Sequence, residues 1–154
     1  MGDKPEGPAV LSIITYNEQR FDEQVGVDLD ACLASLQTPD MTWINVAGLH
    51  DASLIEQLGQ ALGLHPLVLE DIANASQRPK VEEYDGYLFV VLKMLEYDLE
   101  REQMEVEQVS LILGDNYLVS FQEDSSDVFE PVRTRLRNGA GGLRNFAADY
   151  LAYA

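Results

Sequence analysis

Two adjacent acids, Glu70 and Asp71, are the residues of this chain whose types could do the most definite chemistry. Two carboxylates about 5 Å apart repel each other by roughly 3 kcal/mol at an effective dielectric of 20, and a divalent cation relieves that repulsion. Mg²⁺ prefers such hard oxygen ligands, keeps several of its waters and often takes only one or two carboxylates. Consecutive residues of a helix, however, point about 100° apart, so the two acids cannot easily face one ion. The residues alone therefore favour a solvated acidic helix face over a metal site.

The other residue types that could do chemistry are scattered along the chain. His50 and His65 each precede or cap an expected helix, where a histidine more often has a structural role, and their separation of 15 positions does not resemble zinc-ligand spacing. No stretch has the pattern of a nucleophile elbow, a P-loop or a dinucleotide-binding turn. A metal-dependent hydrolase that uses the acid pair and a histidine stays an alternative. We expect no enzyme, because the sequence assembles no base, nucleophile and oxyanion site.

Composition sets the broad class of the protein and excludes one kind of partner. The chain has 154 residues, of which 46% are hydrophobic, so it is long enough for one domain with a sizeable core. Its formal net charge of −17 repels nucleic-acid phosphates and concentrates cations nearby. Solubility alone also accounts for such acidity. We therefore expect no nucleic-acid partner, and cations are the one ligand class that the charge favours.

Cysteine usage and the apolar runs indicate the compartment. Cys32 is the single cysteine, which excludes a disulfide framework or thiolate cluster and fits a reducing cytosol. The first eight residues contain charged side chains and lack the apolar stretch of a signal peptide. No apolar run approaches the roughly 18 residues that a spanning helix needs. We expect that this stretch by itself does not cross a membrane.

The acid pair is expected on a short helix at the rim of a buried sheet. Gly63 ends the preceding helix, and Pro66 suits a first helical turn, where the missing N–H has no partner to lose. The residue before Pro79 is pushed towards extended geometry, so the chain should leave the helix as a strand. Residues 87–92 contain too few polar side chains for a sheet face in water and predict a central strand covered on both sides. Arg78 and Lys80 are expected to neutralise nearby acids.

Further strands and helices are expected before and after this segment. The strands are predicted at residues 10–16, 41–47, 106–113 and 117–122. The helices are predicted at residues 29–36, 54–62, 127–137 and from 143 onwards. The acidic stretch 18–30 predicts a loop or an edge strand, and the stretch 96–107 predicts a solvated hairpin loop. Such irregular interleaving, with hairpins late in the chain, indicates an α/β fold whose mixed β-sheet is sandwiched between helices, α/β/α.

Several blocks of the chain resemble, in the same order, the N-terminal cytoplasmic domain of CorA-type magnesium transporters. They are Thr42-Trp43-Ile44-Asn45, residues 65–71, 77–81, 87–94 and 108–112, and Phe121-Gln122-Glu123. The resemblance runs from about residue 41 to the end of the sequence. It implies an α/β/α cytoplasmic domain at residues 1–140. It also implies that residues 143–154 begin a long helix that leads to a membrane domain beyond this sequence.

The resemblance also implies a regulatory role for the acid pair. In the family, the aspartate at the position of Asp71 faces the neighbouring subunit and contributes to a regulatory Mg²⁺ site, whose occupancy favours the closed channel. The partner acid lies beyond residue 154, so Asp71 is expected to be half of a site, with Glu70 as a weaker metal candidate. The expected function is thus the Mg²⁺-sensing domain of a homopentameric channel for Mg²⁺ and Co²⁺. Its expected place is the cytoplasmic face of the cell membrane, joined to its own C-terminal membrane domain. A zinc-transporting relative in the same family stays an alternative.

Overall fold

The computed structural model describes residues 10–17, 20–38, 40–48, 52–74, 77–123 and 129. Seven strands lie within these ranges: β1 (Val10–Tyr16), β2 (Phe21–Val27), β3 (Met41–Ala47), β4 (Lys80–Tyr84), β5 (Tyr87–Asp98), β6 (Gln103–Leu113) and β7 (Tyr117–Gln122). The helices within these ranges are α1 (Leu29–Ser35), α2 (Ala52–Leu62) and α3 (Pro66–Ala73). Each helix is short, so tertiary packing and caps must supply most of its stability.

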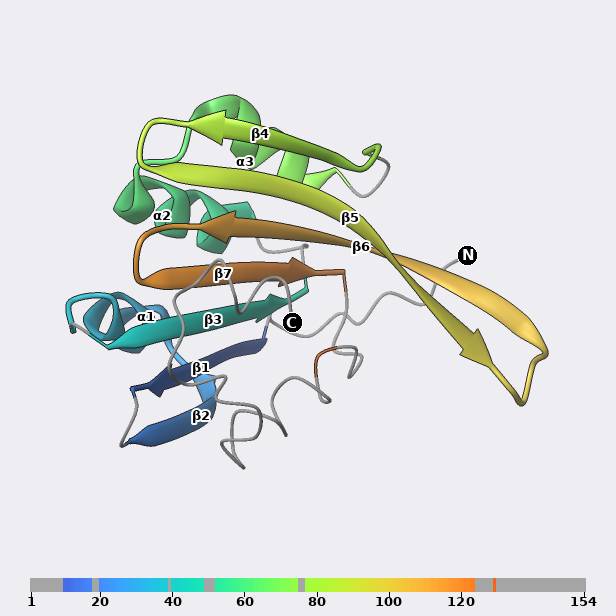
Figure 1. The fold of residues 1–154 in the computed structure, drawn as a ribbon, viewed down its shortest axis with the longest axis horizontal. Helices are drawn as coiled ribbons and strands as arrows, with labels where there is room; N and C mark the ends of the chain where they lie inside the picture. Colours follow the sequence, from blue (N-terminus) through green and yellow to red (C-terminus); the bar gives the residue numbers. More distant parts are fainter. Residues whose placement is uncertain are drawn as a thin grey trace.

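The strands form one mixed sheet in the order β2-β1-β3-β7-β6-β5-β4 (Figure 1). Neighbouring strands are antiparallel except β3 and β7, which run parallel with Asn45 opposite Ser120. A parallel pair needs a long crossover, and here α2, α3 and three strands lie between its members along the chain. The β5–β6 pairing continues out to Asp98 and Gln103, so this hairpin projects beyond the rest of the sheet (Figure 1).

All three described helices pack on one face of the sheet. Their buried residues, among them Cys32, Leu58 and Ile72, belong to one cluster with alternate strand residues such as Ile44 and Phe89. This alternation is the period of two that puts every second side chain of a strand on the same face. Helices α2 and α3 lie in close contact at Gly59 of α2. A side-chain carbon added there would collide with the Leu69 side chain of α3. The helical layer therefore holds α3 against both the sheet and α2.

The opposite face of the sheet is apolar as well and contains a buried polar row. Phe129 packs edge-on against Trp43, with ring centroids 5.4 Å apart. The Trp43 indole N–H donates to Ser120 Oγ at 2.9 Å, and that hydroxyl donates to Asn45 Oδ1 at 2.7 Å. The Asn45 amide in turn donates to Gln122 Oε1 at 2.7 Å. Because buried polar groups are costly unless they are paired, this row favours the β3–β7 pairing over others.

Most expected elements in the described part of the chain are confirmed. Strands β1 and β3 begin and end where the sequence predicts them, and the acidic stretch 18–30 contains the edge strand β2. The mixed sheet and its packed helices confirm the α/β class. The predicted helices at 127–137 and 143–154, and with them the boundary near residue 140 and a second helical layer, lie outside the described residues.

Two predictions about this sheet are wrong. Residues 87–92 belong to β5, which lies next to the edge strand β4, and Leu88 there is 36% exposed. The central strand of the sheet is β7. The stretch 96–107 is mostly strand, because β5 continues to Asp98 and β6 begins at Gln103. Pairing between the two strands satisfies their backbone groups, and the acidic residues of this stretch do not prevent that pairing.

Candidate functional site

Helix α3 holds both acids in a fixed orientation. His65 caps its first turn, as expected, because its Nδ1 accepts a hydrogen bond of 3.1 Å from the Leu67 N–H. The backbone N–H of His65 donates to the Tyr87 hydroxyl at 3.0 Å, which ties the start of α3 to the start of β5. Val68 and Ile72 are completely buried against the sheet. Because the cap and the buried face of α3 are fixed in this way, the two acids on its outer side have defined neighbours.

Asp71 points towards β4 and pairs with Lys80. The Lys80 Nζ lies 2.6 Å from Asp71 Oδ2 and 3.1 Å from Glu82 Oε1. It also lies 5.5 Å from the ring centroid of Phe89, within cation–π range. The side chains of Asp71 and Lys80 are 24% and 30% exposed, so the pair is partly shielded from water. The hydrogen bond that the Lys80 ammonium donates to Asp71, together with its contact to Glu82, raises the pKa of Lys80 and keeps its ammonium charged.

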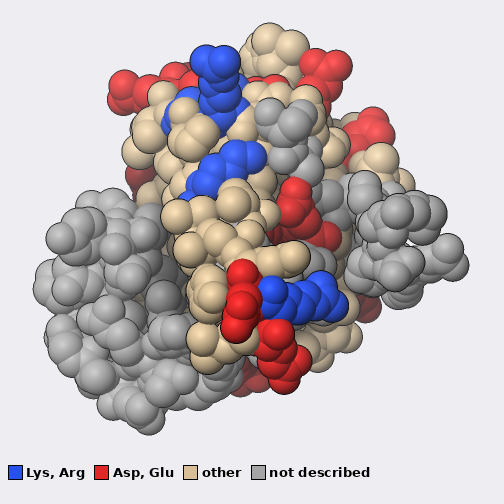
Figure 2. Space-filling view, turned by 90° about the vertical axis from the view of Figure 1, so that its right-hand side faces the viewer, with Lys and Arg blue, Asp and Glu red and all other residues tan. Residues whose placement is uncertain are grey.

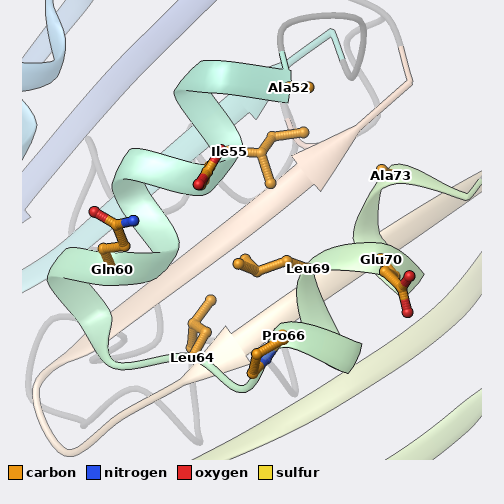
Figure 3. Close-up of a pocket in the computed structure, with 9 residues that line it drawn as sticks. Ala52, Ile55, Gln60, Leu64, Pro66, Leu69, Glu70 and Ala73 are labelled. Carbon is orange, nitrogen blue, oxygen red and sulfur yellow. The ribbon is translucent and has the colours of Figure 1, made fainter.

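Glu70 lies on a different face of α3 from Asp71. It lines a groove of about 460 Å³ between α2 and α3, whose lining includes Ile55, Leu64 and Leu69 (Figure 3). Leu69 points from α3 towards α2, whereas the Glu70 carboxylate points away from α2 (Figure 3). The two acids therefore have separate surroundings, one beside a cation and the other at the edge of an apolar groove. This matches the 100° spacing of consecutive helical residues.

The described residues do not form a complete metal site by themselves. In the part of the chain that the structure describes, no three His, Cys, Asp or Glu side chains are grouped so as to hold an ion. The Asp71 carboxylate nevertheless fits a cation, since an ammonium already stands 2.6 Å from Oδ2. Mg²⁺ needs few protein ligands because it keeps waters, so a second carboxylate from another chain could complete such a site.

Among the described residues, His65 does not join the acid pair in a catalytic arrangement. His65 uses Nδ1 as the acceptor of the helix cap. The prediction for His50 lies outside the described residues. The hydrolase alternative thus gains no assembled base and nucleophile from this structure.

Sequence reasoning identified Lys80 only in general terms, as a base near acids. Its two partners belong to different elements: Asp71 lies on α3, and Glu82 lies on β4, the same strand as Lys80. The Glu82 contact follows from alternation, because residues 80 and 82 of a strand share a face. The Asp71 contact depends on how α3 lies over β4, which no local pattern encodes.

Charge on the surface is mixed on the face that Figure 2 shows. The face at the β5–β6 end of the sheet has acidic and basic side chains interspersed (Figure 2). The net charge of −17 therefore does not gather there as one negative field. None of the described helices is both long and apolar enough to cross a membrane.

Solved structures define the class of this domain as the α/β fold of CorA-like soluble domains. The full-length CmaX protein superposes with a TM-score of 0.72 at 14% identity, over 97% of this chain and 45% of its own. The soluble domain of CorA from Methanocaldococcus jannaschii gives a TM-score of 0.55 at 12% identity, over 82% of this chain and 46% of that chain. The ZntB cytoplasmic domain from Vibrio parahaemolyticus RIMD 2210633 gives a TM-score of 0.56 at 12% identity, over 83% of this chain and 50% of that chain. At these identities the likeness shows the fold alone.

Sequence comparison places the chain in its family. The model of the CorA-like Mg²⁺ transporter protein family matches residues 39–152. The cobalt/magnesium transport protein CorA of Thermotoga maritima is 44% identical over 144 residues, which are 94% of this chain and 41% of that protein. The chain belongs to the CorA-like Mg²⁺ transporter family. It spans less than half the length of this curated relative.

Proposed function

We propose that this chain is the cytoplasmic regulatory domain of a longer CorA-type protein that conducts Mg²⁺, and also Co²⁺, across the cell membrane. The Thermotoga relative, at 44% identity, carries both ions in its name. The parent is a homopentamer, and the conducting part is its C-terminal membrane domain. The described domain itself acts by binding ions and neighbouring subunits, without catalysing a reaction.

Within this function, Asp71 is a ligand of a regulatory Mg²⁺ ion at the interface between subunits. The observation that carries the proposal is a partly exposed carboxylate, 24% accessible, that is held in place by a capped helix and is already engaged with one cation. Its own chain offers no complete metal group among the described residues. A neighbouring copy supplies the remaining acid. Glu70 is a weaker candidate, because it lies at the edge of the groove between α2 and α3, on a different face of α3 from Asp71.

Ion binding regulates the parent protein by linkage between occupancy and subunit arrangement. Each copy brings a net charge of −17 to the assembly, so close approach of acids across an interface is unfavourable without a cation. An ion that binds better to the closed arrangement shifts the closed–open equilibrium by that difference in affinity. High Mg²⁺ inside the cell therefore holds the subunits closed, and its loss lets them separate.

The test is Asp71→Asn in the full-length protein, measured as Mg²⁺-dependent protection of the domain from chymotrypsin. Loss of one carboxylate ligand should raise the Mg²⁺ midpoint of protection by about tenfold or more, equivalent to about 1.4 kcal/mol of binding free energy. Glu83→Gln is the matched control, because Glu83 is an exposed acid of β4 on the opposite face from Lys80 and its loss should leave the midpoint unchanged. An unchanged midpoint in Asp71→Asn would refute the role of Asp71.

A further inference from the structure

Lys80 is held more tightly than an ordinary surface lysine. It is the first residue of β4, opposite Val91 of β5, and its side chain lies on the same sheet face as α3. Its ammonium is held by Asp71 at 2.6 Å, by Glu82 at 3.1 Å and over the Phe89 ring at 5.5 Å. Three contacts from two strands and a helix define one position for this positive charge.

That position conflicts with a metal ion at Asp71. An ion bound to Oδ2 would take the place of an ammonium now at hydrogen-bond distance from the same atom. Two cations at one carboxylate oxygen repel each other strongly, and partial burial reduces screening by water. For the ion to bind there, the ammonium has to move away from Asp71.

We propose that Lys80 is a built-in competitor for the cation at Asp71 and sets the Mg²⁺ concentration at which the regulatory site fills. This inference rests on the proposed function of Asp71. The Lys80 ammonium and the Mg²⁺ ion compete for the same carboxylate. The affinity of the site for Mg²⁺ is therefore lower than it would be if Asp71 had no lysine partner. A sensor with such a competitor empties when intracellular Mg²⁺ falls.

Glu82 makes this exchange feasible. It already contacts the same ammonium at 3.1 Å, and its side chain is 40% exposed. When the ion takes Asp71, Lys80 keeps Glu82 as its partner, so no charge is left buried and unpaired. The Lys80 side chain therefore needs only a small movement, from sharing two carboxylates to pairing with one.

A purely structural role for Lys80 predicts a different result. If the Asp71–Lys80 pair only fastens α3 to β4, removing the ammonium should loosen α3 and weaken Mg²⁺ binding. If Lys80 competes with the ion, removing the ammonium should strengthen Mg²⁺ binding. The direction of the change separates the two roles.

The experiment compares Lys80→Gln, Lys80→Arg and Asp71→Asn in the full-length protein by the Mg²⁺ midpoint of protection from chymotrypsin. Chymotrypsin is chosen because trypsin would cut at Lys80 itself. We expect Lys80→Gln to lower the midpoint by about fivefold or more, the lower end of couplings between two ligands on one protein. Lys80→Arg keeps the charge and should stay near the wild-type midpoint. Lys80→Met, which keeps the apolar stem over Phe89, gives the same test if Lys80→Gln does not fold.

A substitution at Glu82 tests the proposal independently, because it should shift the Mg²⁺ midpoint in the opposite direction from Lys80→Gln. Glu82→Gln leaves Lys80 with Asp71 as its one carboxylate and should raise the midpoint above that of Glu83→Gln, which removes the same charge from the opposite face of β4. An unchanged or raised midpoint in Lys80→Gln, together with a lost response in Asp71→Asn, would overturn the competition and leave the Asp71 site standing. An unchanged midpoint in Asp71→Asn would overturn both the competition by Lys80 and the Mg²⁺ site at Asp71.

Discussion

At the residue scale, the carboxylate of Asp71 is paired with the Lys80 ammonium, and we propose that a Mg²⁺ ion exchanges with this ammonium there. Its distance of 2.6 Å to the Lys80 ammonium and its partial exposure make the ion pair accessible to competition. A partly exposed pair contributes little to folding stability, so its replacement by an ion has a small folding cost. The residues that hold Asp71 in place are therefore those of the cap and inner face of α3.

The His65 cap gives a prediction about folding at this scale. His65→Ala removes the Nδ1 acceptor of the Leu67 N–H and should lower the free energy of unfolding by about 1 kcal/mol. His65→Asn should restore most of this loss, because asparagine is a favourable N-cap residue. Urea denaturation of the three proteins measures the difference. Equal stability of the alanine variant and the wild type would contradict a cap at this position.

At the scale of elements, local patterns identify strands and helices but not their places in the sheet. The capped α3 and the buried β3 follow from Pro66, from Gly48 and from the apolar run between 41 and 47, which are local signals. The position of β5 next to an edge strand depends on which strands pair, and pairing joins residues far apart in the chain. Asp71 could be named as a candidate from the sequence. Its pairing with Lys80 could not, because that contact depends on how α3 packs over β4.

The buried polar row between β3 and β7 gives a prediction at this scale. Ser120→Ala removes the acceptor of the Trp43 indole N–H and the donor to Asn45 Oδ1, both in the interior. We expect it to lower the free energy of unfolding by about 2 kcal/mol, within the range for buried polar groups that lose a partner.

Ser53→Ala is the control for this prediction, because Ser53 is an exposed serine of α2 and should change stability by less than about 0.5 kcal/mol. Chemical denaturation followed by Trp43 fluorescence reports both variants. If Ser120→Ala is as stable as the control, the row does not support the parallel pairing.

At the scale of the whole molecule, a mixed α/β domain with a formal net charge of −17 carries helix α3, with Asp71, against one face of its sheet. The family model matches residues 39–152, and the chain spans 41% of the length of the Thermotoga relative. Copies that each have a formal charge of −17 assemble more easily when cations lie between them. The proposed regulation therefore links ion occupancy at Asp71 to the arrangement of whole subunits.

The most direct test of this account is a structure of the full-length assembly with Mn²⁺ in place of Mg²⁺, so that anomalous scattering locates the ion. We predict an ion about 2.1 Å from an Asp71 carboxylate oxygen, at the distance typical of Mg²⁺. An acid of the neighbouring subunit should complete the site, with Lys80 turned to Glu82. An assembly in which Asp71 stays paired with Lys80, with no ion at the carboxylate and no neighbouring subunit within reach, would contradict the account.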